Sequence, residues 1–139
     1  MNPSSGFLLS SPDQKSPAAD HKSPLLADCH LHFEGCLPPE VLQRLARRAA
    51  HPFADLEAFE ARRRSVRNDA GFLSLYAEVS RLFRRPEEYG EAARAIGESL
   101  ARDGVAYAEI YVSPAILSRM ALDGASCLQA IWMLIRTTK

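Results

Sequence analysis

The stretch from Leu25 to Cys36, LLADCHLHFEGC, places the tightest constraint on the fold. Its residues follow the two-residue period of a β-strand, in which neighbouring side chains point to opposite faces. The apolar face comprises Leu25, Ala27, Cys29, Leu31 and Phe33, and the other face comprises Leu26, Asp28, His30 and His32. The pattern predicts a strand that packs through one face and presents polar, ionisable groups on the other.

A second stretch, VAYAEIYV at residues 105–112, has the same period. Its apolar face carries Ala106, Ala108, Ile110 and Val112, and its other face carries Val105, Tyr107, Glu109 and Tyr111. Between and after the two strands, apolar residues recur at helical spacing. The spacing predicts helices over 41–49, 55–66, 72–83, 86–102 and 125–135, with Gly104 as a left-handed cap and a loop after Pro114.

Strands separated by helices indicate parallel pairing through right-handed crossovers, an α/β architecture. We predict the N-terminal portion of a (β/α)8 TIM-type barrel, in which the apolar strand faces pack on helices and His30, His32, Glu109 and Tyr111 point inward. A complete barrel takes about 250 residues. The 139 residues of this chain reach only the second strand and the helix after it, so the predicted barrel is incomplete.

Composition divides the chain into two parts. Residues 1–24 are rich in Ser, Pro, Asp and Lys and have no periodicity, which is typical of a disordered tail. Residues 25–139 carry the strand and helix patterns and form the predicted partial barrel.

The three cysteines are an odd number without a CxxC pair and indicate reduced thiols. No stretch resembles a signal peptide or a membrane helix. We therefore expect a soluble, cytoplasmic protein.

Charge gives no reason to expect a nucleic-acid or membrane partner, because 17 Lys and Arg balance 17 Asp and Glu. The arginine run at residues 62–64 favours a solvated helix face, balanced by Asp55, Glu57 and Glu60. No aromatic residues alternate with these arginines to stack on bases. An RNA-binding module remains a competing hypothesis, and it predicts a strongly salt-dependent affinity.

The histidine pair is the first candidate site. Residues i and i+2 of a strand point the same way, so His30 and His32 can converge on one ion. Neutral imidazole is a good zinc ligand, and catalytic zinc sites usually take three protein ligands and leave one position for water. The alternative is that both histidines are satisfied polar residues of a barrel interior.

Three blocks of the sequence resemble the adenosine deaminase family, zinc enzymes of the amidohydrolase superfamily. LLADCHLHFEGCLPPEVLQRLARR resembles the family's opening strand, turn and helix. FLSLYAEVSRLF resembles its helix over the substrate pocket, and EEYGEAARAIGESLARDGVAYAEIYVSP resembles its next helix and second strand. The blocks occur in the family's order and extend from about Leu25 to Ile116.

The resemblance implies a role for each matching residue. His30 and His32 would bind zinc, and Glu34 and Gly35 would contact the substrate. An apolar gate to the pocket would be built from Phe72, Leu73 and Tyr76, for which ordinary helix core is the alternative.

For three other residues the sequence favours structural roles. Glu109 is interpreted as a paired structural carboxylate and Cys29 as a packing residue. His51 follows a helix and is interpreted as a surface residue.

The implied reaction is hydrolytic deamination of adenosine to inosine and ammonia. Zinc lowers the pKa of a bound water so that hydroxide can attack the purine carbon that bears the amino group. In the family, the remaining ligands and the proton-transferring groups come from later strands, so we expect no catalytic residue in this chain and no activity of the chain alone.

One position departs from the adenosine-specific pattern. Members that act on adenosine usually have Asp where this chain has Glu34, whereas adenine-specific and aminofutalosine-type relatives often have Glu. Ser113 and Pro114, in contrast, resemble the nucleoside deaminases. The substrate is therefore a purine nucleoside or base. A non-catalytic fragment that binds a full-length relative, or itself, through an exposed sheet edge is the other hypothesis.

Overall fold

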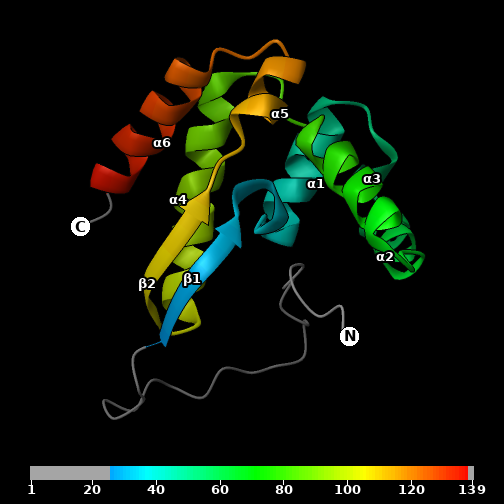
Figure 1. Cartoon of the computed structure of the whole chain (residues 1–139), viewed down its shortest axis with the longest axis horizontal. Coiled ribbons are helices and arrows are strands. Elements are labelled where there is room, and N and C mark those ends of the chain that lie inside the picture. Colours follow the sequence, from blue (N-terminus) through cyan, green and yellow to red (C-terminus); the bar gives the residue numbers. More distant parts are fainter. Residues whose placement is uncertain (1–25, 138–139) are drawn as a thin grey trace.

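The computed structural model describes residues 26–137, so the predicted disordered tail lies outside the described residues. Two strands and a set of helices alternate along the chain (Figure 1). In order they are β1 (Leu26–His32), η1 (Phe33–Gly35), α1 (Pro39–Arg48), η2 (Pro52–Ala54), α2 (Leu56–Arg64), α3 (Asp69–Ser80), α4 (Pro86–Arg102), β2 (Val105–Tyr111), α5 (Pro114–Arg119) and α6 (Gly124–Thr137).

The strands β1 and β2 pair in parallel, as predicted. The pairing joins Leu26 to Val105 and His32 to Tyr111, with an irregular register between Asp28 and Leu31. In residues 26–137 the sheet has these two strands only, so each has one edge without a partner strand in this part of the chain. The crossover between them contains α1 to α4, and the arrangement is a portion of a (β/α)8 barrel.

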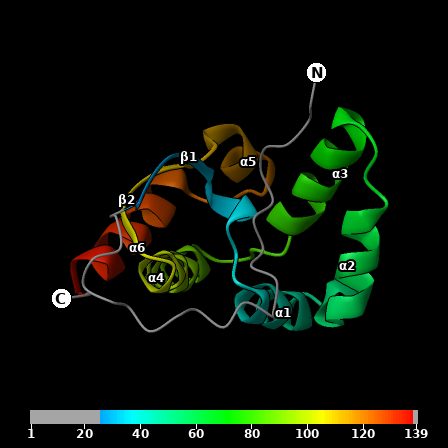
Figure 2. The same ribbon diagram turned by 90° about the horizontal axis from the view of Figure 1, so that it is seen from below.

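Helices enclose a core beside the sheet. α4 packs against β2 and along α6, while α2 and α3 lie together at the end of the molecule away from α6 (Figures 1 and 2). The core centres on Tyr89, whose ring stacks on Phe33 and Phe83 at centroid distances of 5.3 and 4.2 Å. Further buried side chains around it include Leu42, Leu45, Leu75, Leu82 and Ile96.

Helix starts and ends follow local signals. Asn68 begins α3 by accepting a hydrogen bond from the Gly71 amide at 2.9 Å, so this helix starts three residues before the predicted position. Gly104 has a φ of 79° after α4, the left-handed conformation predicted for it.

Two predictions about structure were wrong. The segment after Pro114 was expected to be a loop but forms the short helix α5, because a proline suits the first position of a helix and Leu117 is buried. Cys29 was expected to pack, yet it is exposed. α4 packs beside β2, where Ile110 contacts the core, and leaves Cys29 uncovered.

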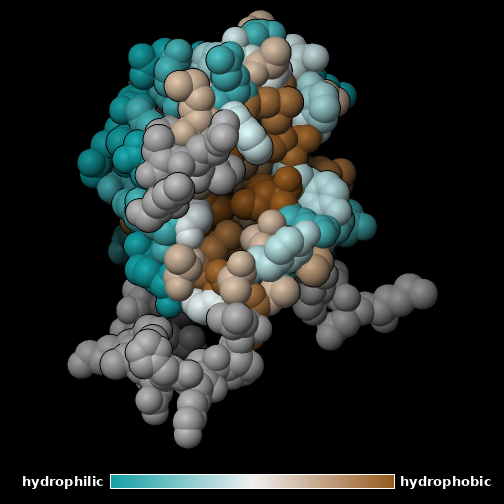
Figure 3. Space-filling model, turned by 90° about the vertical axis from the view of Figure 1, so that its left-hand side faces the viewer, coloured by the Kyte–Doolittle hydropathy of each residue, from teal (hydrophilic) through white to brown (hydrophobic). Residues whose placement is uncertain are grey.

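The side of the molecule formed by β2 and α6 exposes apolar residues. Figure 3 views this side and shows hydrophobic residues gathered at its centre. Tyr107 and Tyr111 of β2 and Leu128 of α6 are each about half exposed.

None of the helices within residues 26–137 has the length and hydropathy of a membrane span.

Candidate metal centre and groove

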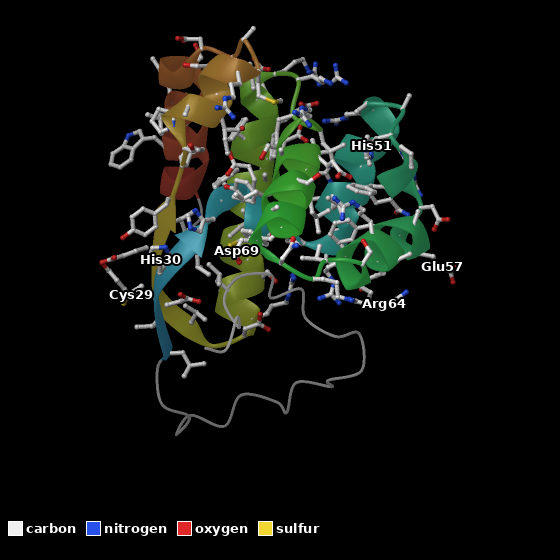
Figure 4. All side chains as sticks on the ribbon, turned by 45° about the vertical axis from the view of Figure 1, so that its right-hand side comes forward. Cys29, His30, His51, Glu57, Arg64 and Asp69 are labelled. Carbon is white, nitrogen blue, oxygen red and sulfur yellow. The ribbon has the colours of Figure 1, made fainter. Side chains whose placement is uncertain are left out.

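The two histidines of β1 lie side by side on one face of the strand, as the alternation predicts. Their Nε2 atoms are 3.3 Å apart, and their ring centroids are 5.1 Å apart. Both side chains are exposed, so an ion can reach the two nitrogens. Figure 4 shows His30 on β1 next to β2.

The separation of the two nitrogens fits a shared metal ion. Two nitrogen ligands of a tetrahedral zinc, each about 2.0–2.1 Å from the ion, are roughly 3.3–3.4 Å apart. The observed 3.3 Å agrees with this separation. Within the described part of the chain, no group of three His, Cys, Asp or Glu side chains could hold a metal. The spacing of His30 and His32 therefore fits two ligands of one zinc ion.

Aromatic side chains border the histidine pair. The Tyr111 ring lies 4.7 Å from the His30 ring and 6.2 Å from the His32 ring, centroid to centroid. On the other side, the Tyr76 ring meets the His32 ring edge-on at 6.1 Å. Tyr111 comes from β2 and Tyr76 from α3, so three separate elements meet at this point.

Glu34 lies in η1, directly after β1, and is fully buried. The Tyr76 hydroxyl donates a hydrogen bond to its Oε2 at 2.5 Å, and the Tyr89 hydroxyl donates to its Oε1 at 3.3 Å. Burial raises the pKa of Tyr76 well above its usual value. The hydrogen bond to Glu34, and then the negative charge of Glu34, raise it further. The pKa of Tyr89 is also raised, chiefly by burial. Both tyrosines therefore stay protonated and keep donating.

The predicted role of Glu34 and Gly35 in substrate binding stays a prediction. Both residues are buried, and the two tyrosines occupy both carboxylate oxygens of Glu34. Glu34 is thus hydrogen-bonded to Tyr76, whose ring borders His32.

A groove of about 900 Å³ opens beside His32, which is the last residue of β1. Leu73 and Tyr76, two of the three predicted gate residues, line it, and Leu73 is 62% exposed. Phe72 is outside the lining and stacks on Tyr76 at 6.1 Å. The remaining lining residues are Ala77, Ser80, Arg81, Phe83, Arg84, Ser113, Ala115, Ile116, Arg119 and Met120.

Sequence reasoning missed most of this lining. Ser80 lies one helical turn after Tyr76 and could have been found from that spacing. Arg119 and Met120 could not be found in this way, because they reach the groove through α5, a segment for which the sequence predicts a loop. The groove lies where β1 and β2 end, the position at which barrel enzymes build their active sites.

The remaining candidates have structural surroundings. Glu109 accepts a hydrogen bond from the Tyr107 hydroxyl at 2.8 Å on the exposed face of β2. His51 is half-buried rather than exposed, and its Nδ1 accepts from the Phe53 amide at 3.2 Å. Figure 4 places His51 well apart from His30.

The arginine run is paired with acidic residues, in agreement with a solvated face. Arg63 pairs with Glu60 at 2.8 Å, as the balance of charges predicts. Arg62 instead reaches Glu78 of α3 at 2.7 Å, so this pair joins α2 to α3. Asp55 accepts a hydrogen bond from the Glu57 amide at the start of α2.

The cysteines should differ in reactivity. Burial and the nearby Asp28 and Glu34 raise the pKa of Cys36 to about 11, and Cys127 is fully buried. Because the thiolate is the nucleophile, iodoacetamide at pH 7.5 should alkylate the exposed Cys29 at least about tenfold faster than it alkylates Cys36 or Cys127. Mass spectrometry of peptides over time measures the three rates. Cys29→Ser should remove the fast phase, and fast alkylation of Cys36 would contradict the described burial.

Comparison with known proteins supplies the family. The sequence model described as adenosine deaminase matches residues 25–137. Adenine deaminase of Mesorhizobium japonicum is 36% identical over 95 residues, which are 66% of this chain and 28% of that protein. Adenine deaminase of Streptomyces coelicolor is 31% identical over 108 residues, which are 76% of this chain and 32% of that protein.

Solved structures agree with the sequence comparison. The crystal structure of an adenine deaminase from Arthrobacter aurescens matches with a TM-score of 0.73 and 27% identity, over 83% of this chain and 36% of that one. The N6-methyl-AMP deaminase from Arabidopsis thaliana shares the fold, with a TM-score of 0.62 and 20% identity, over 83% of this chain and 34% of that one. The chain spans about a third of the length of the relatives that it matches. It belongs to the adenosine deaminase family, a family of purine deaminases, and its described residues form the N-terminal part of the family's barrel.

Proposed function

We propose that this chain carries the N-terminal part of a zinc-dependent site that deaminates a purine by hydrolysis. The observation that carries the proposal is the 3.3 Å separation of the His30 and His32 Nε2 atoms beside a groove at the strand ends. Zinc, when bound, supplies a water of lowered pKa as the nucleophile. His30 and His32 would hold the ion from below the groove.

The other residues of the chain position the substrate. Leu73 and Tyr76 give the groove an apolar wall against which a purine ring can lie. Glu34 fixes the Tyr76 hydroxyl and so fixes the ring that borders His32. Proton transfer to the purine is assigned to residues outside the described range, so we propose that the chain alone does not turn over substrate.

Adenine fits the proposal best. Relatives named adenine deaminase match this chain at 36% and 31% identity, and adenine-specific members often have Glu at the position of Glu34. Adenosine is the second candidate, because Ser113 and Pro114 after β2 resemble the nucleoside deaminases. A cytoplasmic setting is part of the proposal, and the free thiols of Cys29, Cys36 and Cys127 support it.

A chimaera tests the function. Residues 26–137 of this chain replace the matching third of the Arthrobacter aurescens adenine deaminase, the structure with which this chain shares a TM-score of 0.73. We expect the zinc-loaded chimaera to release ammonia from adenine faster than from adenosine, and this chain alone to release none above background. A folded, zinc-loaded chimaera that is inactive on both compounds would contradict the proposal.

A further inference from the structure

Three arginines line the groove that His32 borders. Arg81 caps the end of α3, Arg84 lies in the connection from α3 to α4, and Arg119 is the last residue of α5. Figure 1 shows α5 and the α3–α4 connection at the end of the molecule toward which both strands point. The lining contains no aspartate or glutamate. The charged side chains that line this groove are therefore all positive, apart from the titratable His32.

These arginines differ from most others in the described part of the chain. Six arginines there form ion pairs with carboxylates within 4.0 Å: Arg44, Arg48, Arg62, Arg63, Arg64 and Arg85. None of those ion pairs includes Arg81, Arg84 or Arg119. Arg47, Arg67, Arg94 and Arg102 also lie outside these ion pairs. What distinguishes the three groove arginines is that they line one groove whose lining has no carboxylate.

The rest of the groove suits a ligand with one apolar and one anionic part. Ala115, Ile116 and Met120 add apolar surface to that of Leu73 and Tyr76. Ser113 adds a hydroxyl, and the Ser80 hydroxyl is fixed by donating to the Tyr76 carbonyl at 2.7 Å. Guanidinium groups bind phosphate through paired, charge-assisted hydrogen bonds.

We propose that Arg81, Arg84 and Arg119 form a phosphate-binding subsite of this groove. The phosphate belongs either to a purine nucleoside monophosphate, whose ring lies toward His32, or to free orthophosphate bound beside a purine. The purine part of the inference rests on the proposed function, whereas the phosphate part rests on the arginines alone.

Isothermal titration calorimetry of the full chain at low ionic strength tests the subsite with AMP, adenosine and sodium phosphate. If the nucleotide is the source, AMP binds at least about tenfold more tightly than adenosine, the range expected for one or more charge-assisted bonds. The double variant Arg81→Gln, Arg119→Gln reduces the preference for AMP over adenosine to less than about threefold in affinity. If orthophosphate is the source, it binds by itself, and the same variant weakens it at least about tenfold.

Arg94→Gln is the matched control. Arg94 is exposed on α4, lies outside the groove and is in none of the recorded ion pairs, so this variant changes the same charge and should keep the phosphate affinity. Circular dichroism verifies that each variant keeps its helices, and Arg84→Gln alone replaces the double variant if that one unfolds.

The outcomes separate the subsite from the proposed function. Equal affinity for AMP and adenosine, together with no arginine-dependent binding of orthophosphate, overturns the subsite. Binding of adenosine in that case would leave the proposed function standing. Arginine-dependent phosphate binding without any purine binding supports the subsite and counts against the proposed function.

Discussion

The double substitution His30→Ala, His32→Ala should lower the rate of ammonia release by the chimaera by roughly 10³-fold or more. These residues offer two nitrogens at the spacing of ligands on one tetrahedral ion. If zinc no longer bound there, the attacking water would keep its ordinary high pKa, which would cost several kcal/mol at the transition state. An ammonia assay with saturating adenine measures the loss.

His51→Ala is the control for this experiment. It removes the same kind of side chain at a position that caps η2 and lies apart from His30. We expect the rate of ammonia release to change by less than about threefold, because His51 contacts neither the histidine pair nor the groove. A double variant that kept its rate would show that zinc does not depend on His30 and His32.

The second large effect is on folding. Tyr89→Ala should lower the free energy of unfolding by about 3–5 kcal/mol, the range for truncating a large buried aromatic residue. Tyr89 is fully buried between Phe33 and Phe83, and its hydroxyl donates to the buried Glu34. Urea denaturation followed by circular dichroism measures the change.

Tyr89→Phe separates the ring from the hydroxyl. The variant keeps the ring stacking and removes one of the two donors to Glu34, so we expect a loss of about 1–2 kcal/mol. If Tyr89→Phe cost as much as Tyr89→Ala, the hydrogen bond rather than the aromatic packing would hold this core together. If Tyr89→Ala cost less than 1 kcal/mol, the described core would be wrong.

The strands and most helices could be predicted because their signals are local. Alternation placed His30 and His32 on one face of β1, and the same period placed Tyr111 on the facing side of β2. Gly104 ends α4 in the conformation that its position required. Each of these inferences needs only neighbouring residues and the geometry of an extended or helical backbone.

The contacts of the site could not be predicted in the same way. Tyr89 reaches Glu34 across 55 positions, and that meeting depends on how α4 packs against η1 and its surroundings. The same holds for the groove, whose lining takes Arg81 from the end of α3 and Arg119 from α5. Cys29 is the opposite case. The alternation places it on the apolar face of β1 and so predicts packing, but its side chain is exposed.

Binding of zinc to the histidine pair is the central claim, and nitrogen NMR of the full chain tests it most directly. In ¹⁵N-labelled protein without an affinity tag, added zinc should shift the Nε2 resonances of His30 and His32 together, with one binding curve, and leave His51 unchanged. Independent curves for the two histidines, or a response of His51 equal to theirs, would contradict a shared metal ion between the two rings.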